Sequence, residues 1–408
     1  MLLSLPTLVT LFTSITVTLA ASSPARLDHS SSTHAPRSFS PRAAICPPKI
    51  FSQYYPAWTN AQTPSQIDWK RGDVVFYFAS PTTKDGLALP VGSTLEGLKK
   101  FVAAAKTAGK KPGLTLGGWE GSQYFSNLVA TVKNRDKFAQ TVKTWVTTYG
   151  FTSVSFDWEF IGKQGAGNNV VRSTDAANLI KFFTLLRTTL GTGITISADV
   201  PAGGITGADG QKMTDLRKFA ANLDYIALMT YDFYGPWSST SGPHSALYTC
   251  NSSSYSIDQS VKDWTSWGVP ACKLLLGVPG YSHRFKTASK KLATTTYNGS
   301  PSISFQSLAS PKIDDATPTT KELVSQKLLS SDLSKGLAGY TRYFDNCTQT
   351  PLLFNPSSRI FITYEDNASF KAKGNFAKQK GLAGIAVYDS TGPTASMFNA
   401  IASGFGHA

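Results

Sequence analysis

Residues 151–159 read Phe151-Thr-Ser-Val-Ser-Phe-Asp-Trp-Glu159, and their alternation is the most informative pattern in the chain. Successive side chains of a β-strand point to opposite faces, so the stretch has one apolar and one polar face. The apolar side chains are Val154, Phe156 and Trp158, and the polar ones are Ser153, Ser155, Asp157 and Glu159. The apolar face needs a covering layer. The polar face, which ends in two carboxyl groups, is expected to point into a closed sheet.

This stretch is one of eight strand candidates that alternate with helical patterns. The strand candidates are Ile50–Tyr55, Asp73–Ala79, Pro112–Gly118, Thr152–Glu159, Gly193–Asp199, Leu223–Thr230, Lys273–Pro279 and Leu382–Tyr388. The clearest helical patterns, with apolar residues at i, i+3, i+4 and i+7, are Thr94–Ala108, Arg135–Tyr149 and Thr174–Leu190. Eight such units predict an α/β fold, a parallel (β/α)₈ TIM barrel.

One interval interrupts this rhythm. The strand candidates begin 23 to 50 residues apart, but the last two begin 109 residues apart. A helix at Ala368–Lys380 supplies the ordinary crossover. We therefore predict a small α+β domain, residues 284–364, inserted between strands 7 and 8 of the barrel.

The N-terminal segment is typical of an exported protein. Residues 2–20 carry no charge and end in Thr18-Leu19-Ala20, so residues 1–20 are predicted to be a signal peptide, with a signal anchor as the alternative. Residues 21–45, rich in Ser, Pro and Arg, are expected to be a flexible linker or pro-segment, and residues 46–408 the folded part. No other apolar run is long enough to span a membrane.

Cysteines and sequons agree with export. The chain has four Cys and four Asn-x-Ser/Thr sequons, at Asn251, Asn298, Asn346 and Asn367, which we predict to be glycosylated. We therefore expect a secreted, extracellular glycoprotein, and a monomer.

The charge balance is basic, with 39 Lys and Arg against 25 Asp and Glu, a net charge of +14. Because these residues are scattered, the chain has no basic patch of the kind that binds nucleic acid. The excess favours solubility, or retention on an anionic cell wall. The five histidines (His29, His34, His244, His283 and His407) lack metal-ligand spacing, and Gly203–Gly210 lacks a phosphate-loop lysine, so neither a metal nor a cofactor is expected.

Acidic residues mark several strand ends, where a barrel of this kind carries its chemistry. They are Asp157 and Glu159 on strand 4, Asp199 on strand 5, Asp232 after strand 6 and Asp389 after strand 8. Two carboxyl groups as close as those of Asp157 and Glu159 should not both ionise easily, so one pKa should rise, as a general acid requires. The alternative is a structural pair held by cations or backbone donors.

These strand ends resemble glycoside hydrolase family 18, the chitinase family, over nearly all of the folded length. The matching motifs, in chain order, are Tyr54-Tyr55-Pro-x-Trp58, Leu116-Gly-Gly-Trp119, Asp157-Trp158-Glu159, Met229-Thr-Tyr-Asp-Phe233 and Gly277-Val-Pro-Gly-Tyr281. The inserted domain falls where deep-cleft chitinases carry one, and Gly162-Lys-Gln-Gly165 resembles fungal members. The resemblance implies a secreted, endo-acting chitinase that binds chitin or chito-oligosaccharides.

The family mechanism is a substrate-assisted retention, and the resemblance assigns its catalytic residues here to Glu159, Asp157, Tyr231 and Asp232. Glu159 would protonate the glycosidic oxygen while the substrate's own acetamido group attacks the sugar. Asp157 and Tyr231 would hold that group, and Asp232 would stabilise the distorted sugar. The expected substrate-binding residues are Tyr54, Phe78, Gly118, Trp119, Met229, Phe233, Tyr281 and Tyr388, although core packing is the alternative for each aromatic side chain.

Two departures from the family pattern leave other functions open. Thr152 and Ser155 stand where the family has aspartates, and Tyr388 stands where it usually has a tryptophan. The loss at Ser155 removes a partner of Asp157. A lectin-like protein that binds chitin without hydrolysis is therefore the main alternative, and an endo-β-N-acetylglucosaminidase is a further one.

The strand map predicts the disulfides. Cys46 and Cys272 each precede a strand, at the N-terminal face of the barrel, whereas Cys250 and Cys347 follow strands, at the opposite face. Since a strand is ~20 Å long and bonded Cα atoms lie within ~7 Å, pairs across the barrel are excluded. The predicted pairs are Cys46–Cys272 and Cys250–Cys347.

Overall fold

The computed structural model describes residues 46–407, except 60, 251–254, 304–305 and 310–316. The predicted signal peptide (1–20), the segment 21–45 and the sequon at Asn251 lie outside the described residues. Among the described helices, none is long and apolar enough to cross a membrane.

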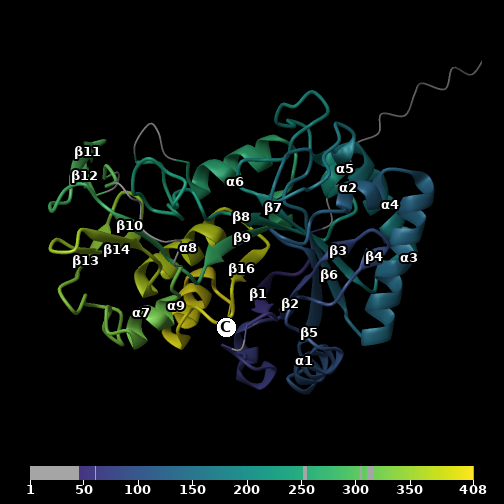
Figure 1. Ribbon diagram of the computed structural model, residues 1–408, viewed down its shortest axis with the longest axis horizontal. Coiled ribbons are helices and arrows are strands. Elements are labelled where there is room, and N and C mark those ends of the chain that lie inside the picture. The colour runs from purple at the N-terminus through teal and green to yellow at the C-terminus, as the bar shows by residue number, and fades with distance from the viewer. Residues whose placement is uncertain (1–45, 60, 251–254, 304–305, 310–316, 408) are drawn as a thin grey trace, which may run out of the picture. The chain divides into compact units, whose positions relative to one another are not determined.

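Eight parallel strands close into a barrel in the order β1-β2-β5-β6-β7-β8-β9-β16, which confirms the predicted TIM barrel (Figure 1). The strands are β1 (Ile50–Pro56), β2 (Val74–Ser80), β5 (Lys111–Gly117), β6 (Ser153–Asp157), β7 (Thr195–Pro201), β8 (Tyr225–Met229), β9 (Leu274–Pro279) and β16 (Gly384–Tyr388). Each lies within one or two residues of the predicted range. A two-stranded hairpin, β3 (Thr82–Thr83) and β4 (Gly86–Leu87), follows β2.

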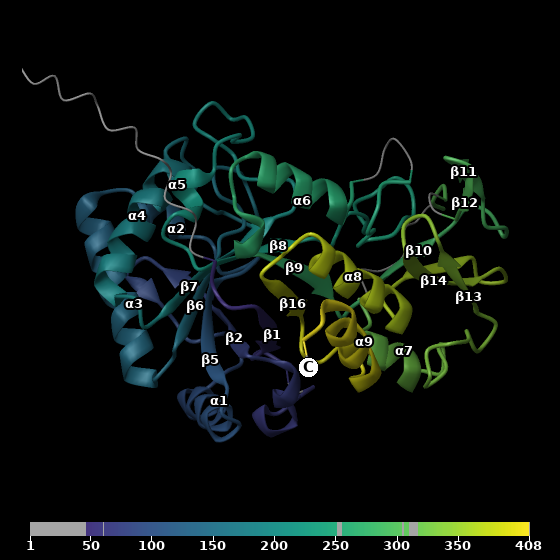
Figure 2. The same cartoon turned by 180° about the vertical axis from the view of Figure 1, so that it is seen from behind.

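Helices cover the outside of the barrel, as Figures 1 and 2 show from opposite sides. They are α1 (Leu95–Thr107), α2 (Phe125–Val129), α3 (Val132–Tyr149), α4 (Asp175–Leu190), α5 (Arg217–Ala220), α6 (Ile257–Ser266), α8 (Asn367–Gln379) and α9 (Ala395–Phe405), with short 3₁₀ turns at Pro64–Gln66, Trp69–Arg71 and Ala271–Lys273. Helix α3 starts three residues before the predicted Arg135 because the Thr131 hydroxyl accepts a hydrogen bond from the amide of Asn134 and caps it.

The two faces of β6 separate as the sequence predicts. Val154, Phe156 and Trp158 are buried in the large core between the strands and the helices, where Phe156 contacts Phe182 and Phe183 of α4. A second, smaller core fills the barrel itself. The polar side chains of β6 point the other way, and Asp157 pairs in register with Asp199 of β7 and with Gly117 of β5.

The segment between β9 and β16 contains the predicted mixture of strands and helix. Its elements are β10 (His283–Lys286), β11 (Thr295–Tyr297), β12 (Ser300–Ser302), α7 (Thr320–Ser325), β13 (Thr341–Asp345), β14 (Thr350–Asn355) and β15 (Ile360–Thr363). Four of the strands form an antiparallel sheet in the order β10-β15-β14-β13, which lies to one side of the barrel (Figure 2). In β15, Phe361 packs in a local core whereas Ile360 and Ile362 join the large one, so the sheet is anchored to the barrel.

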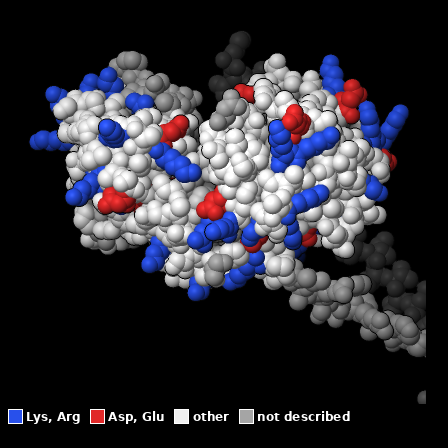
Figure 3. Space-filling view, turned by 90° about the horizontal axis from the view of Figure 1, so that it is seen from below, with Lys and Arg blue, Asp and Glu red and all other residues white. Residues whose placement is uncertain are grey.

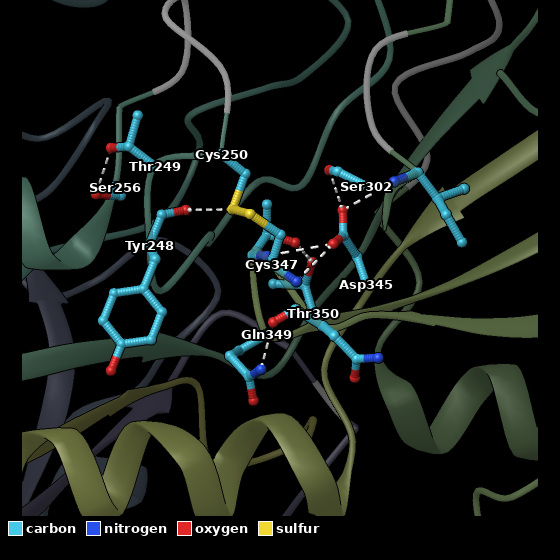
Figure 4. The surroundings of a disulfide bond; sticks show 12 residues. Tyr248, Thr249, Cys250, Ser256, Ser302, Asp345, Cys347, Gln349 and Thr350 are labelled. Carbon is cyan, nitrogen blue, oxygen red and sulfur yellow. Dashed lines mark hydrogen bonds between the residues drawn. A yellow bond between two sulfur atoms is a disulfide. The ribbon is translucent and has the colours of Figure 1, made fainter. Parts of the chain in front are cut away.

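Both disulfides have the predicted pairing. Cys46 is bonded to Cys272 and Cys250 to Cys347, with Cα atoms 5.5 and 5.7 Å apart. Figure 4 shows the second bond, which joins the loop after β8 to the turn between β13 and β14. It therefore ties the inserted sheet to a barrel loop at the end of the barrel where the strands terminate.

A buried ion pair lies beneath this junction. The ammonium group of Lys373 in α8 donates hydrogen bonds to the carboxylate of Glu365 and to the hydroxyl of Ser245, at 2.9 Å for the latter. Both charged side chains are almost fully buried, at 0% and 1% exposure. Because Ser245 lies in the loop after β8, whereas Glu365 follows β15 and Lys373 is in α8, the contacts join the β8 loop to a segment more than 100 residues further along the chain.

Replacement of Lys373 by Met is expected to lower the free energy of unfolding by about 3–5 kcal/mol, because it leaves the Glu365 carboxylate buried without its cation. The double variant Lys373→Met/Glu365→Leu, which removes both charges, should recover most of this loss. Urea unfolding of the two variants measures the difference. A single variant as stable as the parent would show that the ion pair does not hold this junction.

Candidate active site

The residues singled out from the sequence meet at the C-terminal ends of the barrel strands. Tyr54 comes from β1, Phe78 from β2, Asp157 from β6 and Tyr388 from β16. Glu159 follows β6 and is partly exposed, whereas Asp157 is 3% exposed. The strand therefore ends with one carboxyl group inside the barrel and the next at its mouth.

The carboxyl groups of Asp157, Glu159 and Asp199 have raised pKa values, and burial also raises the pKa of Asp389, which follows β16. Burial, followed by the charges of Glu159 and Asp199, raises the pKa of Asp157. Burial, followed by the charges of Asp232 and Asp199, raises the pKa of Glu159 to about 8. Burial also raises the pKa of Asp199 to about 7, although hydrogen bonds to its carboxylate oppose the shift. Protons are thus retained in this cluster near neutral pH, as the sequence analysis expected for one member of the pair.

Asp199 supplies a carboxyl group that the sequence analysis did not assign to the site. Its Oδ1 accepts a hydrogen bond of 2.5 Å from the Tyr54 hydroxyl, and its Oδ2 accepts one of 2.9 Å from the Ser155 hydroxyl. Ser155 is the position where the departure from the family motif seemed to leave Asp157 without a partner. Asp199 lies in register with Asp157 on the neighbouring strand, so a carboxyl group remains beside Asp157, although Asp157 Oδ1 has no hydrogen-bond partner among the described residues. The signal was the inward-facing position of Asp199 at the end of its strand.

Aromatic rings form the floor of the site around Tyr388. Its ring lies 5.9 Å from that of Tyr54 and 5.2 Å from that of Phe78. The Tyr231 ring stacks on it at 6.0 Å, and the Tyr281 ring meets it edge-on at 6.0 Å. These residues come from strands and loops throughout the chain, and Tyr388 joins them into one aromatic surface.

The end of β5 and the loop after it contact the main chain between Asp157 and Glu159. Gly117 has a φ of +100°, and a Cβ there would lie 2.2 Å from the carbonyl oxygen of Asp157, so no larger residue fits. The amide of Gly118 donates to that oxygen at 2.8 Å. The Ser122 hydroxyl donates to it at 3.0 Å and accepts from the amide of Glu159 at 2.9 Å. Together these contacts fix the backbone between the two carboxyl groups.

A second group of polar side chains lies at the rim, around Asp232. This residue has a φ of +59°, and its Oδ1 accepts a hydrogen bond of 2.7 Å from the Tyr281 hydroxyl. The Nε2 atom of His283 lies 2.8 Å from the same oxygen, and the Nδ1 atom of His244 lies 3.8 Å from it. From the sequence, no metal site was expected at these histidines, because they lie 39 residues apart and lack metal-ligand spacing.

The remaining predicted residues are less closely joined to this cluster. Trp119 is 52% exposed, and its ring meets that of Phe160 edge-on at 6.0 Å. Met229, the last residue of β8, is partly exposed. Phe233 packs on Tyr255 and against the protein cores, so its contacts are those of a structural residue.

Comparison with known proteins identifies the family. The family model described as glycosyl hydrolases family 18 matches residues 51–392, which is most of the chain. The chain belongs to glycosyl hydrolase family 18.

The proteins similar to this chain include some named chitinases and some named chitinase-like effectors. A chitinase-like effector of Moniliophthora roreri is 34% identical over 367 residues, which cover 84% of this chain and 89% of the effector. Chitinase B of Serratia marcescens is 27% identical, over 75% of this chain and 68% of that protein. The crystal structure of a chitinase from Rhizomucor miehei superposes with a TM-score of 0.78 at 26% identity, and covers 87% of this chain and 99% of that one.

The buried carboxyl group of Asp199 predicts how the stability of this family 18 protein depends on pH. The folded state keeps the proton of Asp199 up to about pH 7, whereas the unfolded chain releases it near pH 4. Stability from this group is thus present at low pH and is lost as pH rises towards 7, by a few kcal/mol. In the Asp199→Asn variant, the free energy of unfolding should fall less between pH 5 and pH 8 than in the parent.

Two further variants test whether the pH dependence of stability comes from the Asp199 carboxyl group or from any loss of an acidic side chain. Asp215 is exposed, and its pKa is lowered to about 2 by hydrogen bonds from Arg217, so Asp215→Asn should leave the pH dependence between 5 and 8 unchanged. The exchange Ser155→Asp/Asp199→Ser moves the carboxyl group to the adjacent strand and should keep the parent's pH dependence. Parallel curves for the parent and Asp199→Asn would contradict the assignment.

Proposed function

We propose that the chain hydrolyses β-1,4-linked N-acetylglucosamine polymers, with Glu159 as the acid and base of a retaining, substrate-assisted reaction. The observation that carries the proposal is the environment of Glu159. Its carboxyl group stands at the barrel mouth beside a buried Asp157, with a pKa of about 8. A carboxyl group that keeps its proton at neutral pH can donate it to a leaving-group oxygen.

The proposed first step breaks the glycosidic bond. Glu159 gives its proton to the glycosidic oxygen, and the carbonyl oxygen of the N-acetyl group attacks the anomeric carbon of the same sugar. This attack forms an oxazolinium ion. The reaction retains the configuration of the anomeric carbon and needs only one acid from the protein. In the second step, Glu159 takes a proton from a water molecule, and the water oxygen bonds to the anomeric carbon. The bond between that carbon and the acetamido oxygen breaks, which opens the oxazolinium ring, and Glu159 is again the protonated acid.

The proposed scheme gives each neighbouring residue a role. Asp157 would accept the acetamido N–H and stabilise the positive charge of the intermediate. The Tyr231 hydroxyl would donate to the acetamido oxygen, and Asp232, 43% exposed at the rim, would hold the distorted sugar. Tyr388 offers an aromatic face below them, on which an apolar sugar face can stack.

Binding without hydrolysis is the second candidate. Two relatives named chitinase-like effector, from Moniliophthora roreri and Moniliophthora perniciosa, are 34% and 30% identical to the chain. The substitutions at Thr152 and Ser155 favour the same candidate, because they alter the motif that precedes the acid. Both functions would use the aromatic floor to bind a chito-oligosaccharide. They differ only in whether Glu159 catalyses hydrolysis of the bound oligosaccharide.

We further propose that the protein acts outside the cell, as a secreted glycoprotein and a monomer. Its two disulfides are typical of oxidising compartments. Of the sequons in the described residues, Asn298 and Asn346 are exposed and Asn367, at the start of α8, is partly buried. Lys and Arg are spread across the face in Figure 3 among a few acidic side chains, as expected for a solvated surface or for retention on an anionic wall.

Replacement of Glu159 by Gln tests the proposed reaction. Gln keeps the size of the side chain but cannot donate a proton, so hydrolysis of a soluble chito-oligosaccharide should fall by about 10²-fold or more. Binding of the same oligosaccharide, measured by calorimetry, should persist because the aromatic floor remains. Glu120→Gln is the matched control, since Glu120 is an exposed acid next to Trp119 and should keep full activity.

The outcomes distinguish the two candidates. If the parent binds the oligosaccharide but shows no hydrolysis, the binding function replaces the enzymatic one. If Glu159→Gln retains more than a few per cent of the parent's activity, Glu159 is not the acid.

The pKa of Glu159 also predicts the pH profile. Only the protonated acid can donate to the leaving group, so the rate should fall as pH rises through about 8. Above that pH, the rate should drop about tenfold for each unit. Hydrolysis rates measured from pH 5 to pH 10 show where this decrease begins. A decrease that begins near the ordinary pKa of a glutamic acid would contradict the environment described for Glu159.

A further inference from the structure

A group of three potential metal ligands lies at the rim of the site. Asp232 follows β8, His244 lies in the loop beyond it, and His283 is the first residue of β10. One ligand atom from each of the three lies within 4.8 Å of the others. The rings of the two histidines are 5.0 Å apart. The tertiary structure therefore joins two imidazoles and one carboxylate, although the residues are separated in sequence.

Of the four ring nitrogens of His244 and His283, only Nε2 of His283 has a hydrogen-bond partner among the described residues, namely Asp232. The His244 side chain is fully buried, and neither of its ring nitrogens has a hydrogen-bond partner among the described residues. His283 is 4% exposed, and its Nδ1 is likewise without a partner. Buried polar atoms are nearly always paired. A neutral imidazole has one donor and one acceptor nitrogen, so packing alone leaves His244 unsatisfied.

The distances suit coordination of a small ion. Imidazole nitrogens and carboxylate oxygens bind Zn²⁺ at about 2.0–2.2 Å, which places two ligands of one ion roughly 3–4 Å apart. The distance of 3.8 Å between His244 Nδ1 and Asp232 Oδ1 already falls in this range. His283 Nε2, at 2.8 Å from the same oxygen, would need to move by less than about 1 Å. The exposed side of Asp232 leaves a path from solvent and an open coordination position.

We propose that Asp232, His244 and His283 form a binding site for one divalent transition-metal ion of the Zn²⁺ class. Two imidazoles and a carboxylate are a ligand set that such ions take in preference to Mg²⁺ or Ca²⁺. The bound ion would compete with the Tyr281 hydroxyl for the Asp232 oxygen. If Asp232 also contacts the sugar, as the proposed function assumes, the ion and an oligosaccharide would each weaken the binding of the other.

Calorimetric titration with zinc chloride tests the site. The parent protein for this test is the untagged chain with His29→Gln and His34→Gln, so that the histidines of the segment 21–45 do not contribute. We expect one Zn²⁺ per chain. The variants His244→Gln and His283→Gln should each lower the affinity by more than about tenfold, because each removes a ligand.

His407→Gln is the matched control. His407 also faces a carboxylate, with its Nε2 atom 2.9 Å from Asp73, but this pair lacks a second histidine. Its replacement should leave the Zn²⁺ affinity unchanged. The proposal is overturned if the parent takes up no ion, or if His283→Gln and the parent bind Zn²⁺ equally well.

A measurement on the parent alone avoids dependence on variants that fold poorly. Addition of one equivalent of Cu²⁺ should give an electron paramagnetic resonance spectrum with hyperfine coupling to two imidazole nitrogens. A spectrum with none, or with the signal of the free ion, would overturn the site. Oligosaccharide binding with and without Zn²⁺ is a separate measurement, so failure of the proposed function would leave the metal titration interpretable.

Discussion

The confinement of carboxyl groups inside an apolar barrel is the constraint on which the rest of this structure depends. Asp157 and Asp199 are 3% and 4% exposed, and their burial disfavours ionisation of both. The hydroxyls of Tyr54 and Ser155 hold Asp199 by hydrogen bonds, and Gly117 allows the backbone of β5 to approach that of Asp157. The apolar outer face of β6, packed against helices, keeps these groups where they are. Without that packing, the carboxyl groups would reach water and lose their raised pKa values.

The rim of the barrel extends this arrangement outward. Tyr388 connects the aromatic side chains of the barrel interior to Tyr231 and Tyr281 on separate loops. The inserted sheet anchors these loops, because one face packs into the large core and the disulfide between Cys250 and Cys347 fastens its edge. The same insertion brings His283 to Asp232. The segment between β9 and β16 thus adds an imidazole to the rim of the site.

The strand map was predictable because it depends on local alternation. Period-two patterns located the eight barrel strands to within one or two residues, and the topology they imply selected the disulfide pairs. Family motifs then pointed to Glu159, Asp157 and Tyr388, and these lie together at the strand ends. Phe233 matched its motif equally well, yet its ring packs on Tyr255 away from the aromatic floor, because a motif does not specify which way a loop side chain turns.

By itself, the amino-acid sequence determined the barrel, the place of the insertion and the pair of acids at the end of strand 4. These follow from alternation, spacing and chain order, which are properties of neighbouring residues. Only the tertiary structure decided which groups surround those acids. It placed Asp199 against Ser155, a contact across 44 residues, and brought Asp232 and His244, both from the connection after β8, next to His283 of β10. Hydrogen bonds, desolvation and metal coordination act over a few ångströms in space, so they depend on distances that chain order does not contain.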